Sequence, residues 1–425
     1  MRIYVLGAPV LALASIIACS GASNTSGFGN DGGASGSGSG GSSSGSSGSG
    51  SSSGLLGGSS SGLNGSSSGT TGDGGFVCDP NPLNYDIPGN GCDDDKDGKV
   101  DNAAVHCDTG TMPPSNLSGA GTAADILAAM GICQPADSTH WGIVSATYTN
   151  GHSQTGPGKS NFAQQHGTLG TFGSVIKSRE GALMGVLSSG SATATDSDSG
   201  PQFKGGKSGM QGAAGILSGN GGDVPSGFPK TSPGCASLSK VVNDVIDVKA
   251  SIKVPANAKG FSFDFDFWSG EWPDYVCTEF NDSFIAYLTS AAFNGGTADN
   301  ISFDTNKNTI SVNNNFFQSC TPAVQTGCNG GTTGTSTCSL GAGELAGTGF
   351  GDPTDTYCKD TSTSGGATSW LTSTAPIKPG ETISIEFLIW DTGDESYDSS
   401  VLLDNWSWQP QEVAATPITQ PSPPK

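Results

Sequence analysis

The sequence predicts a mainly β protein, an antiparallel and jelly-roll-like β-sandwich with a few short helices, preceded by a disordered Ser/Gly-rich tether. Residues 20–75 are almost entirely Ser and Gly, so this segment cannot bury apolar surface and should be a flexible coil. Beyond about residue 240, apolar and polar residues alternate in stretches that Gly- and Asn-rich loops separate. Such alternation is typical of antiparallel strands with one face on a core and one face in water. Several such strands favour a sandwich.

The chain begins with the features of an export signal. Met1 and Arg2 provide one positive charge, and residues 3–18 form an apolar run too short to span a bilayer stably. The run ends in the letters IIAC, which resemble the lipobox of bacterial lipoproteins. This resemblance implies that residues 1–19 are a lipoprotein signal peptide and that Cys19 carries a lipid anchor to a membrane. The alternative is an ordinary signal peptide with a chance cysteine.

The charge balance argues against a nucleic-acid partner. Asp and Glu number 38 against 17 Lys and Arg, giving a formal net charge of −21 over 425 residues. This charge repels phosphate backbones, and no cluster of Lys and Arg offsets it. The composition instead favours an exported protein that meets cations or neutral sugars.

The cysteines fit an oxidising compartment. The chain has 11 cysteines, and assigning Cys19 to lipid leaves ten, an even set that can form up to five disulfides. Zinc sites are the alternative, but they need CxxC-type spacing, which does not occur here. Four cysteines lie close enough along the chain to staple one loop region: Cys320, Cys328, Cys338 and Cys358. The others are Cys78, Cys92, Cys107, Cys133, Cys235 and Cys277.

Residues 76–180 are predicted to form a cysteine-containing segment with one short helix. The helix is expected over residues 125–133, with Thr122 as its cap and Gly131 near its end.

Residues 181–408 are predicted to form the sandwich. Its clearest strands carry alternating apolar residues: Ile246, Val248, Ala250, Ile252 and Val254; Phe261, Phe263, Phe265 and Phe267; Ile383, Ile385, Phe387 and Ile389. A Cys-rich insertion is expected at about 315–370, and the Pro-rich residues 409–425 are expected to be a disordered tail.

The stretch 91–102, GCDDDKDGKVDN, has the spacing of a calcium loop. Carboxylates stand at loop positions 1, 3, 5 and 9, and Gly98 stands at position 6, where such a loop turns sharply. The predicted metal ligands are the side chains of Asp93, Asp95, Asp97 and Asp101 and the backbone carbonyl of Lys99. The pattern resembles the short calcium loops of dockerins and thrombospondin type 3 repeats.

This loop departs from a full EF-hand, because position 12 is Ala104 rather than a bidentate Glu. Cys92 and Cys107 bracket the loop, so a disulfide there would hold it in place of flanking helices. The expected role of calcium is structural rather than signalling.

A second set of motifs resembles the choice-of-anchor L domain of bacterial surface proteins. In order, the motifs are a Phe-rich strand, Ser-x-Glu-Trp-Pro at 269–273, Phe-Asn-Asp at 280–282, Asp-x-Gly-Asp at 391–394, and Asp-Ser at 398–399. The resemblance extends over about residues 181–408. It implies an exported protein fixed to the cell surface, with no catalytic activity to transfer.

Acidic residues in and directly beside these motifs form a candidate second site for calcium, or for the hydroxyl groups of a glycan beside Trp272 and Tyr275. They are Glu271, Glu279, Asp282, Asp391, Asp394 and Asp398. The alternative is that they simply form turns and satisfy loop backbone groups.

The sequence therefore predicts a non-catalytic, lipid-anchored, exported protein of the outer membrane or cell surface. Its expected role is adhesion or the binding of a glycan, matrix or surface-protein ligand, with structure stabilised by calcium. A purely structural envelope component is one alternative. A secreted carbohydrate-active hydrolase is another, since a Glu/Asp pair on the sandwich could hydrolyse glycosides.

Overall fold

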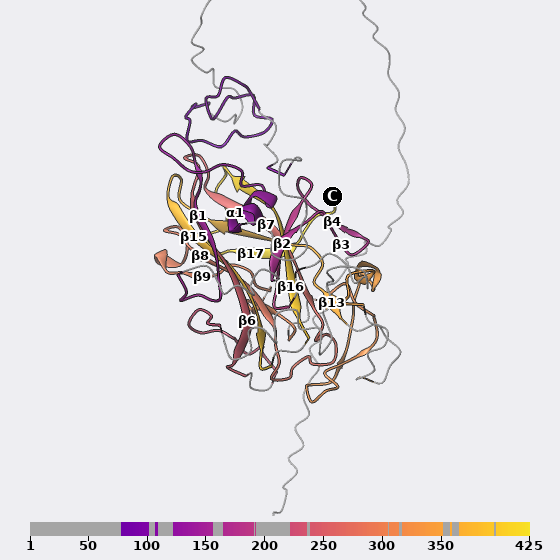
Figure 1. Ribbon diagram of the computed structural model, residues 1–425. Coiled ribbons are helices and arrows are strands. Elements are labelled where there is room, and N and C mark those ends of the chain that lie inside the picture. The colour runs from indigo at the N-terminus through magenta and orange to yellow at the C-terminus, as the bar shows by residue number, and fades with distance from the viewer. Residues whose placement is uncertain are drawn as a thin grey trace, which may run out of the picture. The chain divides into compact units, whose positions relative to one another are not determined.

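The computed structural model (Figure 1) describes residues 78–101, 107–108, 122–155, 165–190, 192, 222–235, 239–304, 306–313, 317–351, 358, 365–394 and 397–425. The predicted signal peptide with Cys19 and the predicted tether over 20–75 lie outside these residues, as does Ala104. All described residues belong to one compact unit.

Two antiparallel sheets carry the fold. The first has the strand order β1-β6-β15-β8-β10, with β9 paired to β8. Its strands are β1 (Gly142–Thr149), β6 (Val242–Lys253), β8 (Ser283–Thr289), β9 (Asp299–Asn300), β10 (Ile310–Ser311) and β15 (Thr382–Thr392). The second has the order β17-β14-β7-β16-β5-β2, with β13 paired to β7. Its strands are β2 (His166–Leu169), β5 (Met184–Ser188), β7 (Gly260–Ser269), β13 (Gly366–Ala367), β14 (Leu371–Pro376), β16 (Ser399–Gln409) and β17 (Ile418–Pro421).

The remaining elements are short. They are α1 (Ala123–Ala129), the 3-10 helices η2 (Asn294–Gly296) and η3 (Gly343–Leu345), and two small hairpins made of β3 (Thr171–Phe172) with β4 (Ile176–Lys177) and of β11 (Gln325–Thr326) with β12 (Gly334–Thr335). Among the described residues, no helix combines the length and the apolarity that crossing a membrane requires.

The two large sheets pack face to face through aromatic side chains. Phe263 of β7 meets Phe387 of β15 with ring centroids 5.2 Å apart, and Phe265 meets Phe284 of β8 at the same separation. The alternating apolar residues predicted for β6, β7 and β15 are buried and belong to this core. The prediction of a mainly β, antiparallel sandwich is confirmed.

The prediction that the polar face of β7 is in contact with water is wrong. Asp264 and Asp266 are buried, because the outer face of the second sheet carries a core of its own that includes Phe172, Trp268 and Phe350. Arg179 covers the outer face with an ion pair whose Nε lies 2.9 Å from Asp264 Oδ2. A strand in the middle of a sheet covered on both sides has no wet face, so its polar positions need buried partners.

Two predicted domain boundaries also need correction. The sandwich begins well before residue 181, because β1 pairs with β6 and β2 pairs with β5. The chain after 409 is not a disordered tail, because β17 adds to the edge of β14. There the hydroxyl groups of Thr419 and Ser373 lie 2.8 Å apart. An edge strand tolerates the prolines of this segment, since one side of it needs no ladder hydrogen bonds.

The predicted short helix is present as α1, which begins after Thr122 as expected but covers Ala123–Ala129 rather than residues 125–133. The Thr122 backbone N–H donates to the Asp125 carboxylate, as in a capping box. The helix lies so close to β5 that a Cβ on Gly185 would come within 2.7 Å of Ile126 Cγ2. Glycine at this position therefore allows α1 to cover the end of the core.

All ten cysteines predicted to remain after lipidation are paired. The pairs are Cys78–Cys92, Cys107–Cys133, Cys235–Cys277, Cys320–Cys338 and Cys328–Cys358. The four cysteines of the insertion pair with each other, as expected for a stapled loop region. The two cysteines that bracket the acidic loop pair outward instead, with Cys78 and with Cys133, so no single disulfide closes that loop.

A pH response of stability follows from His166, which is buried against the ring of Tyr148 with centroids 3.5 Å apart. Burial lowers the pKa of His166 from 6.5 to about 4. The folded protein therefore binds this proton less readily than the unfolded chain, and the contribution is lost as pH falls from about 6.5 toward 4. Relative to His166→Gln, we expect the parent to lose about 2–3 kcal/mol of unfolding free energy between pH 7 and pH 4. Urea unfolding of both proteins across this range measures the difference, and parallel stability curves would contradict it.

Candidate functional site

Three acidic side chains meet at one end of the sandwich. Glu271 follows β7, Asp282 precedes β8, and Asp391 lies near the end of β15. Carboxylate oxygens from all three lie within 4.8 Å of one another. Each side chain is at most 1 % exposed, so the charges are withdrawn from water. We call Glu271, Asp282 and Asp391 the buried acidic cluster.

The strand register explains why residues so far apart in sequence meet. Ser283, the first residue of β8, pairs with Trp390 of β15, which places Asp282 beside Asp391. The pairing of β15 with β6 shifts register between Ile389 and Asp391. A bulge of this kind re-aims a side chain at the rim of a sheet.

Further carboxylates surround the cluster. Asp398 precedes β16 and is buried, and Gly190 leaves room for it, because a Cβ there would come 2.0 Å from Asp398 Oδ2. Asp394 and Asp398 both raise the pKa of Asp391 through their charges. Asp244 of β6 acts in the same way on Asp398. Sequence reasoning missed Asp244, which reads as an ordinary polar position of an alternating strand.

Some of these oxygens are hydrogen-bonded and some are not. Asp282 accepts from the Ser399 hydroxyl at 2.6 Å and from the Thr392 backbone N–H at 3.1 Å. The oxygens of Asp391 and Asp398 are buried and receive no hydrogen bond from a donor group in the part of the chain that the structure describes. Buried polar atoms in native proteins usually have a partner, so these oxygens make this end of the sandwich a candidate site for a cation or for shared protons.

The raised pKa values of these carboxyl groups reflect the free-energy cost of burying them close together. Burial raises the pKa of Glu271 and Asp391 well above the ordinary range, and neighbouring carboxylates raise both further. Burial likewise raises the pKa of Asp282 to about 8, although hydrogen bonds from Ser399 and Thr392 oppose the rise. Burial also raises the pKa of Asp398. A cation bound beside these carboxylates would offset their loss of hydration and would therefore favour their ionised forms.

The donor set suits a hard divalent cation. Carboxylate oxygens are the ligands that calcium and magnesium prefer, and calcium accepts the irregular geometry of groups from several loops more readily than magnesium does. Every cysteine among the residues that the structure describes is in a disulfide, so none of them offers these oxygens a thiolate neighbour that would favour a softer metal.

Glu279 and the two aromatic residues predicted beside the second site do not form part of it. Glu279 is exposed and is not among the residues that converge. Trp272 is only 4 % exposed and stacks on Phe317 with centroids 4.4 Å apart, so its faces are not available to a glycan. Tyr275 is also buried. The acidic end of the sandwich is therefore suited to an ion rather than to a sugar ring.

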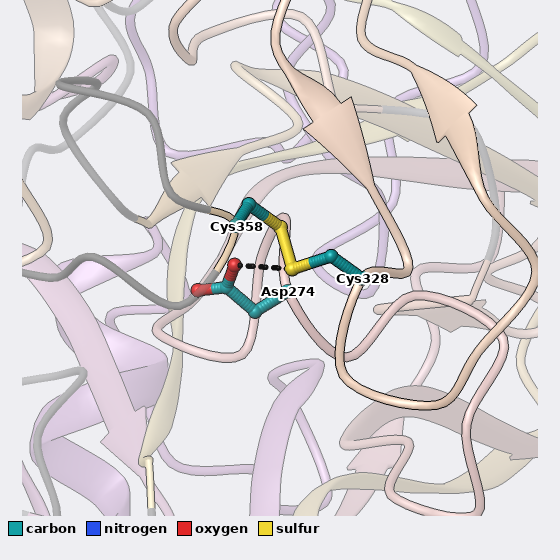
Figure 2. A group of neighbouring side chains, drawn as sticks. All are labelled: Asp274, Cys328 and Cys358. Carbon is teal, nitrogen blue, oxygen red and sulfur yellow. Dashed lines mark hydrogen bonds between the residues drawn. A yellow bond between two sulfur atoms is a disulfide. The ribbon is translucent and has the colours of Figure 1, made fainter.

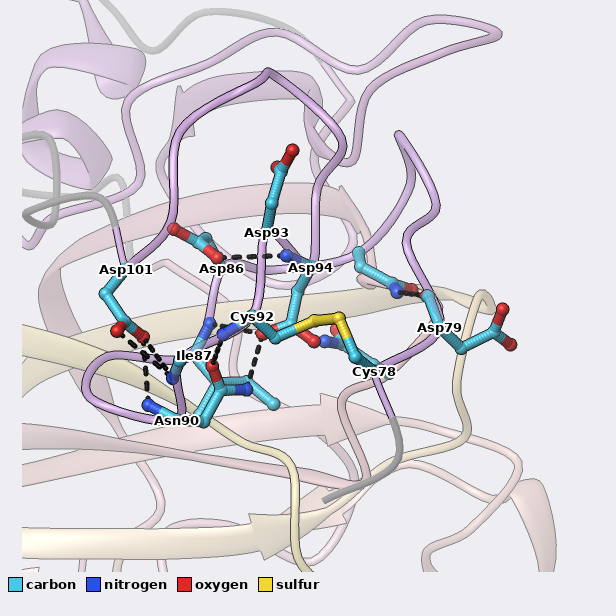
Figure 3. The surroundings of a disulfide bond; sticks show 12 residues. Cys78, Asp79, Asp86, Ile87, Asn90, Cys92, Asp93, Asp94 and Asp101 are labelled. Carbon is cyan, nitrogen blue, oxygen red and sulfur yellow. Dashed lines mark hydrogen bonds between the residues drawn. A yellow bond between two sulfur atoms is a disulfide. The ribbon is translucent and has the colours of Figure 1, made fainter. Parts of the chain in front are cut away.

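The predicted N-terminal calcium loop is drawn in part in Figure 3. Oxygens of Asp93, Asp95 and Asp97 lie within 4.8 Å of one another. Asp101 turns away, because its carboxylate accepts the backbone N–H groups of Asn90 at 2.9 Å and Gly91 at 3.1 Å (Figure 3). The exposed Lys99 places its ammonium 3.2 Å from Asp97 Oδ2.

The loop differs from the buried acidic cluster in how its charges are satisfied. Asp93 accepts the backbone N–H groups of Asp97 and Gly98, both at 3.0 Å. Asp94, between two predicted ligands, points inward and accepts from Ile87 at 3.1 Å and from the Asn90 amide at 2.7 Å. Asp93 and Asp94 therefore turn to different partners, and hydrogen bonds to the loop's own backbone hold it.

A third group of potential metal ligands consists of Asp274, Cys328 and Cys358 (Figure 2). Asp274 Oδ1 lies 3.2 Å from Cys328 Sγ. Both sulfurs belong to one disulfide, so neither is a thiolate and neither carries a proton to donate. This group is a disulfide packed beside a carboxylate rather than a metal site.

Comparison with protein families supplies the wider context. A model of the choice-of-anchor L domain matches residues 146–409. The chain belongs to the choice-of-anchor L domain family. Comparison with curated proteins found no match, and neither did comparison with solved structures. Membership of the choice-of-anchor L family indicates a bacterial surface-associated protein. The buried acidic cluster lies inside the matched region, and the N-terminal loop lies outside it.

The loop can be tested separately from the cluster. If calcium orders it, Asp93→Asn combined with Asp97→Asn should make residues 78–107 several-fold more sensitive to protease in the presence of calcium. Mass spectrometry of limited digests locates the cuts. Asp79→Asn, an exposed change outside the loop, is the matched control. A double variant that resists protease as well as the parent would show that the loop does not depend on calcium.

Proposed function

We propose that this chain is a non-catalytic, lipid-anchored surface protein that mediates adhesion or ligand binding and whose sandwich is stabilised by calcium. Family membership supports export and surface association. The observation that carries the calcium proposal is the burial of Glu271, Asp282 and Asp391 within 4.8 Å of one another.

Electrostatics explains why a cation matters here. Each ionised carboxylate loses hydration when it is buried, and each repels its neighbours in a medium of low dielectric constant. Protonation would relieve this repulsion, but at the cost of keeping acids neutral at a pH far above their usual pKa. One calcium ion removes the repulsion and joins the end of β7, the start of β8 and the end of β15. Loops at the end of a sandwich are common binding surfaces, and a fixed end presents them in one arrangement.

The geometry does not suit a hydrolase at this cluster. Glycoside hydrolysis needs two carboxyl groups that flank a substrate bond in an open cleft. Glu271 is 1 % exposed, and Asp282 and Asp391 are 0 % exposed, so a polysaccharide has no access to them.

The calcium proposal predicts a crossover in stability for Asp391→Asn. In calcium the parent should melt about 5 °C higher than in chelator, as expected for a site that is nearly saturated. Asp391→Asn should lose most of this gain because it removes a ligand. In chelator the same variant should melt above the parent, because Asn removes the free-energy cost of either burying the Asp391 charge or keeping that acid protonated.

Differential scanning calorimetry of the whole chain measures both conditions. Glu279→Gln changes an exposed carboxylate that lies outside the cluster, and it should keep the full calcium effect. A parent that does not respond to calcium, or an Asp391→Asn variant that responds fully, would contradict the proposal.

The lipid anchor has its own test. The full-length parent, expressed in a bacterium with lipoprotein processing, should partition into the detergent phase, whereas Cys19→Ser should be exported but remain in the aqueous phase. Equal partition of the two proteins would favour an ordinary signal peptide.

Adhesion is tested by coating beads with the protein and measuring their attachment to cells and matrix in calcium and in chelator. Calcium-dependent attachment supports the proposed role. Turnover of a polysaccharide would instead indicate an enzyme, and high copy number in the envelope without attachment would indicate a structural component.

A further inference from the structure

We propose that a pocket between the N-terminal segment and the sandwich binds an organic ammonium group, such as a trimethylammonium or a methylated lysine. This proposal rests on the binding role proposed above and names its ligand class. The pocket has a volume of about 330 Å³, which is within the range of small-molecule sites. The buried acidic cluster is not part of this pocket, whereas Asp95 and Asp97 of the N-terminal loop contribute to its lining.

Four aromatic side chains line the pocket: Tyr85, Trp141, Trp406 and Trp408. They form a chain of edge-to-face contacts. Tyr85 meets Trp141 at 6.1 Å and 71°, Trp141 meets Trp408 at 5.7 Å and 81°, and Trp408 meets Trp406 at 5.3 Å and 76°. Because neighbouring ring planes are nearly perpendicular, they make the walls of a box rather than a flat platform.

The box is held in place before any ligand arrives. Trp406 stacks on Phe261 of the core with centroids 4.2 Å apart. Trp141 donates its indole N–H to the Asn84 carbonyl at 2.9 Å. The Tyr85 backbone N–H donates to Asn257 Oδ1 at 2.8 Å, which ties the N-terminal segment to the sandwich. Preorganised walls reduce the entropy lost on binding.

One polar group of the box lacks a partner. Trp406 is 7 % exposed, and its indole N–H makes no hydrogen bond within the described part of the chain. A buried donor of this kind usually finds a partner, so it marks a place where a ligand's acceptor atom or a bound water would sit.

The charge around the box is negative. Four carboxylates contribute to the lining: Asp86, Asp95, Asp97 and Glu180. Lys96 is the one Lys or Arg among the lining residues. His140 also lines the pocket, and its Nδ1 lies 2.9 Å from Asp137 Oδ2. Excess negative charge favours a cationic ligand and disfavours a phosphate or carboxylate ligand.

Aromatic walls and acidic groups together suit an ammonium ion that carries apolar substituents. Such a cation is attracted to aromatic faces, and its methyl groups displace water from the rings. A bare calcium ion gains nothing from indole rings, since it binds oxygen. A neutral sugar offers no charge to complement the net negative lining, which persists although Lys96 lines the pocket and Lys99 pairs with Asp97.

Residues from inside and from outside the region matched by the family model line the pocket. Trp406 and Trp408 belong to β16, inside the region matched by the family model, whereas Tyr85 and Trp141 precede that region. The N-terminal segment therefore adds a site to the sandwich. This origin fits a recognition function that belongs to this chain rather than to the whole domain family.

Isothermal titration of the whole chain with choline tests the proposal, with 3,3-dimethylbutan-1-ol as its uncharged isostere. Choline should bind at least tenfold more tightly than the alcohol. Glu180→Gln should weaken choline binding about threefold to tenfold, and Trp141→Leu should weaken it tenfold or more. Glu412→Gln removes an exposed carboxylate that pairs with Lys259 outside the pocket, and it should leave binding unchanged.

Further arms separate the sources of the ammonium group. A trimethyllysine peptide compared with its unmodified form tests a protein ligand, and phosphatidylcholine vesicles compared with phosphatidylglycerol vesicles test a lipid headgroup. Preference for a neutral monosaccharide, equal binding of choline and its isostere, or full binding by both Glu180→Gln and Trp141→Leu would overturn the proposal. Failure here would leave the calcium response of Asp391→Asn and the lipid partition of Cys19→Ser unaffected, so the two proposals fail separately.

Discussion

Repulsion between carboxylates that the sandwich holds out of water is the constraint on which the end of this fold depends. Glu271 follows β7 and Asp391 lies in β15, and these two strands supply much of the aromatic core. The gain from burying Phe263, Phe265 and Phe387 is what draws the two carboxylates together. Packing and charge therefore oppose each other at this end of the sheets. Under the calcium proposal, a bound divalent cation would remove this conflict.

Local pattern predicted the strands better than it predicted their surroundings. The period-two alternation of β6, β7 and β15 identified the inner face of each strand correctly, because that face depends on the strand's own sequence. It could not show that Asp264 is buried on the outer face of β7. The groups that cover this face, Arg179 among them, come from distant parts of the chain and carry no local signal. The same reason explains the missed β17, since a Pro-rich segment becomes a strand only where an open sheet edge receives it.

For a similar reason, only part of the candidate site could be predicted from the sequence. The sequence motifs that resemble the choice-of-anchor L family contain Glu271, Asp282 and Asp391, so the sequence alone predicts that these three residues belong together. Glu279, which is also predicted to converge with them, is exposed. Sequence distance along a loop does not say which side chains turn inward. Asp244 was missed for the converse reason, since its contribution arises from proximity to Asp398 and not from a motif.

The N-terminal segment shows most clearly what composition and spacing leave out. Its sequence predicts a calcium loop between the tether and the sandwich, in which the acidic residues bind a single ion. In the structure Asp95 and Asp97 also line a pocket whose walls are Trp141, Trp406 and Trp408. One run of carboxylates thus faces two environments, a loop held by its own backbone and an aromatic box. Since the charges of the loop lie at the pocket, a cation bound in the loop would reduce the attraction of the pocket for a second cation. Calcium and an ammonium ligand would then oppose each other at the N-terminal segment, whereas the calcium proposed for the buried acidic cluster would stabilise the sandwich independently.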